Sequence, residues 1–139
     1  MSQLTAADIE KVFKKPGEKR YDYFVKTVAD TEEVYGLADD EGWALLGDDD
    51  DADIIPFFPH AEMAEVFRLA AGFEEYQVNV IDLNELLAWL DDMPEDNMLV
   101  AVLPNTEFNG AVIDPGHLKA DLLKELDKYD EEGRKINKA

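Results

Sequence analysis

The sequence predicts an α+β fold: a single domain in which a mixed sheet of about six strands packs against about five helices. Three observations lead to this prediction. Two segments with helical periodicity open the chain, short apolar runs between acidic turns follow over residues 33–58, and helices alternate with strands after that. With 46% apolar residues in a chain of 139, there is enough hydrophobic material for one core.

The first two elements are helices. Thr5 followed by Asp8 resembles a capping box, and the apolar residues after it recur at helical spacing until Pro16-Gly17. A second helix begins near Glu18 and ends before Asp30. Its apolar face consists of Tyr21, Phe24, Val25 and Val28.

Residues 33–58 predict a three-stranded meander. The strands are 34–37, 43–46 and 54–58, and acidic turns separate them. Regular alternation turns Trp43 and Leu45 toward the core. Because Pro56 has no amide hydrogen to donate, the third strand is short or lies at an edge or a bulge.

Helices and strands alternate in the next part of the chain. A helix opens at Pro59-His60 and closes at Gly72, and it is followed by a strand over 76–81 and a helix over 83–90. The inward face of the first of these helices consists of Met63, Val66, Phe67 and Ala70.

The C-terminal part predicts a hairpin and a long helix. The apolar run 98–103 is typical of a strand covered on both faces, and it pairs with 111–113. Asp114-Pro115 marks the start of the last helix, which is expected to reach about Glu132 and to close at Gly133.

Composition predicts the domain limits and the cellular location. The domain spans residues 1–133, and residues 134–139 form a polar tail. The chain has no cysteine, no apolar signal segment, and no run near the roughly 18 apolar residues of a membrane span. We therefore expect a cytoplasmic protein that does not enter a membrane.

The net charge of −20 is concentrated in the middle of the chain. Residues 30–114 contain 23 acidic residues and a single cation, Arg68, whereas the segments on either side are nearly neutral. So negative a surface repels the phosphate backbone, which disfavours nucleic acid as a partner. It attracts basic proteins instead.

Three sequence strings resemble a known family. VYGLADDEGWALL, IIPFFPHAEMAEVF and DLNELLAWL are similar to a family of small bacterial proteins known as domain-of-unknown-function family 2750, over about residues 20–105. The second half also has a weaker architectural similarity to the domain of enhanced serine sensitivity protein B. The resemblance supports the fold prediction and implies no catalytic residue.

The acidic run near residue 50 is a weak candidate for a metal site. It provides five carboxylates, the ligands that calcium and magnesium prefer. The run does not fit an EF-hand loop, because neither the glycine at the sixth position nor the glutamate at the twelfth is present. A solvated hairpin loop is the alternative. The residues are Asp48, Asp49, Asp50, Asp51 and Asp53.

The sequence contains few residues that could support other kinds of catalytic or binding chemistry. The two histidines, His60 and His117, have no zinc-site spacing, and Ser2 is the only serine. No glycine-rich phosphate loop is present, so no cofactor is predicted. His60 with a carboxylate nevertheless leaves acid–base catalysis open as an alternative.

Aromatic residues are candidates for an interaction surface. Trp43, Trp89 and Tyr35 are expected mostly in the core, whereas Phe57 and Phe58 point in opposite directions along a regular strand. One of these two phenylalanines is therefore expected to be an exposed anchor, close to His60.

The sequence favours a non-enzymatic interaction or regulatory module that binds a basic protein. An immunity-like protein, or a mimic of nucleic acid toward a basic partner, is a sharper alternative. An enzyme built on His60 and a carboxylate is the third. Acidity that serves only solubility would explain the charge equally well.

Overall fold

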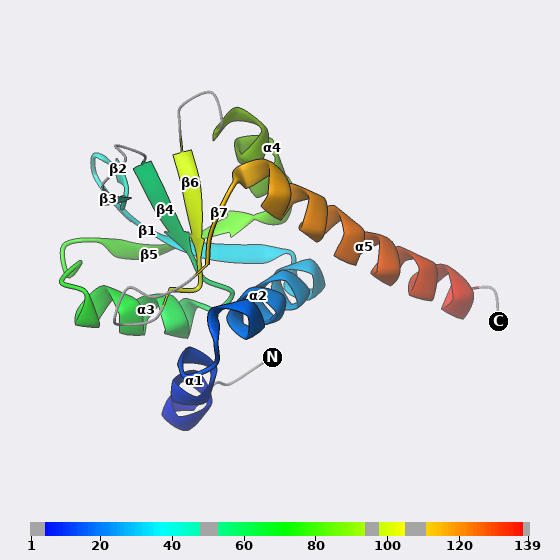
Figure 1. Cartoon of the computed structure of the whole chain (residues 1–139), viewed down its shortest axis with the longest axis horizontal. Helices are drawn as coiled ribbons and strands as arrows, with labels where there is room; N and C mark the ends of the chain where they lie inside the picture. The colour runs from blue at the N-terminus through cyan, green and yellow to red at the C-terminus, as the bar shows by residue number, and fades with distance from the viewer. Residues whose placement is uncertain (1–4, 48–52, 94–97, 105–110, 138–139) are drawn as a thin grey trace.

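The computed structural model describes residues 5–47, 53–93, 98–104 and 111–137, and it confirms the α+β class. Two helices open the described chain, four strands follow, and helices and strands are then interspersed up to α5 (Figure 1). Their bounds are α1 Ala6–Phe13, α2 Gly17–Thr31, β1 Glu33–Asp39, β2 Gly42–Trp43, β3 Leu46–Gly47, β4 Asp53–Phe57, α3 Ala61–Ala70, β5 Gln77–Asp82, α4 Leu83–Asp92, β6 Met98–Val102, β7 Ala111–Ile113 and α5 Pro115–Asn137.

The strands form two sheets rather than the single sheet that we predicted. One sheet has the antiparallel order β2-β1-β5, and the other has the order β3-β4-β6-β7, in which β4 and β6 are parallel. The sheets meet where Tyr35 and Phe58 exchange two backbone hydrogen bonds of 2.8 Å each.

The predicted meander over 33–58 is also wrong. This segment makes two separate hairpins, β1–β2 and β3–β4, one in each sheet. The chain leaves the first sheet at Ala44, whose amide still donates to the Leu37 carbonyl at 2.7 Å. Alternation is lost at this point, so Leu45 is 43% exposed instead of inward.

Pro56 lies where a missing amide donor is tolerated. In β4 it pairs with Ala101 of β6, whereas β3 reaches only Ile54 and Asp53 on the other side. The strand is therefore an edge at this residue, as its proline predicted.

The helices follow their local signals closely. The capping box of α1 is confirmed: the Thr5 hydroxyl accepts from the Asp8 amide at 3.1 Å, and the Asp8 carboxylate accepts from the Thr5 amide at 3.2 Å. Two details are wrong. Ala70 is exposed, and α5 passes Gly133 to reach Asn137, because glycine costs an α-helix only about 1 kcal/mol.

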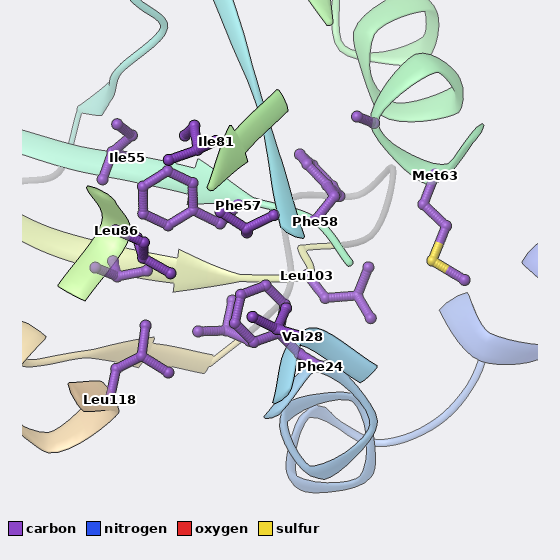
Figure 2. Packing of buried hydrophobic residues seen from close by; sticks show 14 of the residues in the cluster. Phe24, Val28, Ile55, Phe57, Phe58, Met63, Ile81, Leu86, Leu103 and Leu118 are labelled. Carbon is purple, nitrogen blue, oxygen red and sulfur yellow. The ribbon is translucent and has the colours of Figure 1, made fainter. Parts of the chain in front are cut away.

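The core lies between the sheets and the helices (Figure 2). Phe57 and Phe58 are both 0% exposed, so the prediction that one of them is an exposed anchor is wrong. Both sides of the strand are covered: Phe57 points toward Ile81 in Figure 2, and the Phe58 ring lies 5.2 Å from that of Phe67. Alternation along a strand separates core from surface only when one face meets water.

The two longest helices, α2 and α5, pack against each other (Figure 1). At this contact, the Tyr21 hydroxyl donates to the Asp121 carboxylate. Within the described ranges, no helix is both long and apolar enough to cross a bilayer.

Candidate functional site

The structure leaves the predicted metal site untested. Asp48, Asp49, Asp50 and Asp51 lie outside the described residues, and Asp53 is an exposed residue at the start of β4. Among the residues with described positions, no three acidic or histidine side chains converge as metal ligands would. The site stays a prediction from the sequence.

His60 occupies the N-cap position of α3, and its ring is tied to α2. Its Nε2 atom lies 2.9 Å from the Tyr23 hydroxyl, and the two rings are 5.9 Å apart. Burial lowers the pKa of His60, and the nearby Glu62 opposes this shift. His60 lines neither of the two hollows described below. The contact therefore gives His60 a structural role between two helices.

The lowered pKa of His60 predicts a stability that falls in mild acid. Because the folded state disfavours the imidazolium, the stabilisation is complete above the unfolded pKa of about 6.5 and is lost as the pH falls below it. We expect His60→Gln to flatten the decline in unfolding free energy between about pH 7 and pH 5, measured by urea denaturation.

A matched variant separates the two causes. Tyr23→Phe removes the hydroxyl but keeps the ring, and since burial is the main cause, the pH dependence should persist. Parallel curves for wild type and His60→Gln would contradict the assignment.

A groove of about 1180 Å³ lies between α1, the start of α2, and α3. Its floor is apolar, with Ile9, Phe13 and Val66 among the lining residues. The charged residues described in its lining are balanced between three cations and three carboxylates, and Lys14 and Glu10 form an ion pair of 3.0 Å along the α1 side of the groove. The groove therefore selects for neither sign of charge.

A second hollow, of about 410 Å³, contains both tryptophans of the chain; we call it the Trp pocket. The rings of Trp43 and Trp89 meet edge to face, with centroids 5.3 Å apart and planes at 71°. The pocket is lined by Glu41, Gly42, Trp43, Leu45, Ile55, Trp89, Asp92, Met93 and Met98.

Local packing sets the position of each indole. A Cβ atom at Gly36 would lie only 3.0 Å from Cζ3 of Trp43, so the absence of a side chain on β1 makes room for this ring. Trp89 is carried by α4, which is anchored by its buried residues Leu86 and Leu90. Sequence reasoning named both tryptophans but had no signal that pairs β2 with α4.

The charge of the Trp pocket is of one sign. Glu41 and Asp92 are the charged residues in its described lining. Both are exposed: Glu41 directly precedes β2, and Asp92 is the last residue of α4. An indole face attracts cations through its quadrupole, and carboxylates add a Coulombic attraction. The pocket is therefore suited to a cationic group with an apolar stem.

One family model matches the chain: it is described as a protein of unknown function (DUF2750), and it covers residues 21–122. The chain belongs to the DUF2750 family. This confirms the resemblance seen in the sequence strings. The DUF2750 match contains every residue that lines the Trp pocket, whereas α1, one wall of the larger groove, lies outside it.

Searches of curated proteins and of solved structures find no match. The architectural similarity to the enhanced serine sensitivity protein B domain thus stays a prediction.

Proposed function

We propose that this DUF2750 protein is an acidic interaction module that binds a basic protein and takes one of its lysine or arginine side chains into the Trp pocket. The observation that carries the proposal is the pocket itself, in which two indoles lie beside Glu41 and Asp92 and the described lining residues include no cation. Its family description assigns no activity.

The proposed contact has two favourable contributions. A cation held over an indole within about 6 Å of its centre contributes about 0.5–1 kcal/mol at an exposed site, and more when water is excluded. The methylene stem of lysine or arginine would lie against Met93, Met98 and Ile55.

Charge outside the pocket supports the same partner. The segment 30–114, which includes the whole pocket lining, contains one cation among 24 charged residues. Such a field raises the association rate with basic partners and weakens as salt screens it. The larger groove lacks this bias, because its own charges are balanced.

The test uses the tryptophans as reporters, because Trp43 and Trp89 are the only two in the chain. We expect a hexa-arginine peptide to change the intrinsic fluorescence in a saturable way, and the isosteric hexa-citrulline peptide to leave it unchanged. We expect Trp89→Ala to raise the dissociation constant of the hexa-arginine peptide, measured by calorimetry, by about three- to tenfold.

Matched charge variants distinguish the pocket from general attraction. Asp92→Asn should weaken binding by about two- to fivefold, while Asp127→Asn on the exposed side of α5 should have little effect. Equal effects of the two variants would show that only the overall charge attracts the peptide. Equal responses to arginine and citrulline would exclude a cation site.

A further inference from the structure

β5 leaves a six-residue strand edge open. It is an outer strand of its sheet, and in the part of the chain that the structure describes it pairs only with β1. Asn79 and Val80 point to opposite faces of the sheet, yet both are exposed, and Val80 is 56% exposed. The middle of β5, at Asn79 and Val80, is therefore accessible to solvent on both faces of the sheet.

The hydrogen-bond pattern tells which backbone groups face the open edge. The amide and carbonyl of Tyr35 bond to Phe58, away from β5, and Tyr35 is the partner of Val80 in the ladder. Val80 therefore belongs to a non-hydrogen-bonded pair, and its own amide and carbonyl point outward. By alternation, those of Val78 and Asp82 point outward as well.

We propose that β5 is a self-association surface, on which a second copy of this chain adds its own β5 in antiparallel orientation around a two-fold axis at Asn79. Each Val78 then lies opposite Val80 of the other copy and shares both backbone hydrogen bonds with it. The β2-β1-β5 sheets of the two copies then join into one continuous sheet, and each exposed Val80 is covered by the half-buried Val78 of the other copy. This inference is independent of the Trp pocket.

The residues of β5 favour this register over its neighbours. An axis at Val80 would place Val78 opposite Asp82, and an axis at Val78 would place Glu74 opposite Asp82. The register centred on Asn79 gives two valine pairs and sets Asp82 against Tyr76. β-branched cross-strand pairs stabilise a sheet, whereas like charges directly opposite destabilise it.

Charge sets the conditions under which the dimer forms. Each chain has a net charge of −20, so two copies repel at low ionic strength. Since the Debye length shrinks from about 10 Å at 0.1 M salt to about 3 Å at 1 M, self-association should strengthen as salt is added. Binding of the Trp pocket to a cationic peptide should weaken under the same change.

Sedimentation velocity over a range of protein and salt concentrations tests the proposal. We expect a reversible monomer–dimer equilibrium that strengthens with sodium chloride. Val80→Lys should weaken dimerisation at least tenfold. The matched control is Val112→Lys, which makes the same change at another exposed valine, 51% exposed, on the outer strand β7 of the other sheet.

The outcomes are distinct. A dimer that is lost in Val80→Lys and kept in Val112→Lys supports the β5 edge, as does slower amide exchange at Val78 and Val80 with rising protein concentration. A wild-type protein that stays monomeric at high salt overturns the proposal, and so does a dimer that Val80→Lys leaves intact. Circular dichroism verifies that both variants are folded.

Discussion

Replacing Phe57 with alanine is expected to lower the free energy of unfolding by about 3–5 kcal/mol. Phe57 is 0% exposed and is the last residue of β4, next to Phe58, at which the two sheets meet; Figure 2 shows it among the buried residues of the core. Its ring also supports the Trp pocket indirectly, because Phe57 and Trp43 both lie next to Gly36. A Cβ atom built on Gly36 would lie 3.7 Å from Cδ1 of Phe57. The loss would be a large fraction of the roughly 5–15 kcal/mol that stabilises a typical domain.

Urea unfolding followed by tryptophan fluorescence and circular dichroism measures the Phe57 effect. Leu123→Ala is the matched control, since Leu123 is a large apolar residue that is 43% exposed on α5. It should change stability by no more than about 0.5 kcal/mol. Similar losses in both variants would show that Phe57 is not a principal core residue.

Arg20→Met should lower the free energy of unfolding by about 1.5–3 kcal/mol and release α1 from the rest of the molecule. Arg20 is a charged residue that is only 3% exposed, and burial lowers the pKa of its guanidinium. Its Nη1 atom donates to the carbonyls of Phe13 at 2.9 Å and Lys15 at 2.7 Å, at the C-terminal end of α1. Methionine fills similar volume but leaves these carbonyls without their donor.

The readout for Arg20 is local as well as global. An eight-residue helix is not stable alone, so amide exchange in α1 should accelerate more than exchange in β6. Lys14→Met is the control, because Lys14 is exposed and its ion pair with Glu10 contributes little. Uniform acceleration throughout the chain would argue against a specific anchor for α1.

Sequence reasoning predicted the helices better than the sheets, and the difference has a physical cause. Helix starts depend on neighbours such as Thr5 with Asp8, or Asp114 with Pro115, which are visible in a few residues. The division into two sheets depends on which distant segments pair, as Ile54 does with Leu99. Nothing local at Ala44 or Leu45 shows that the chain changes sheets there.

The candidate site was predictable only in its parts. Trp43 and Trp89 were among the aromatic residues considered but were expected mostly in the core, and the acidity of the middle segment was evident from composition. The contact between the two indoles depends on the turn after β1 and on the position of α4 relative to that turn, which the sequence does not indicate. Phe57 and Phe58 misled the prediction because β4 is covered on both faces, a condition that alternation cannot report.

The order in which strands enter the two sheets has a consequence for folding. The longest strands alternate between the sheets along the chain: β1 in the first, β4 in the second, β5 in the first and β6 in the second. The segment between β1 and β5 therefore overlaps the segment between β4 and β6. Neither ladder can form until much of the segment that belongs to the other ladder has been synthesised. Such non-local pairing is typical of slow folding, with the loop-closure entropy of both ladders lost before their contacts compensate for it. A nascent chain released before residue 98 would lack β6, the parallel partner of β4, and would leave that edge of β4 open to other chains.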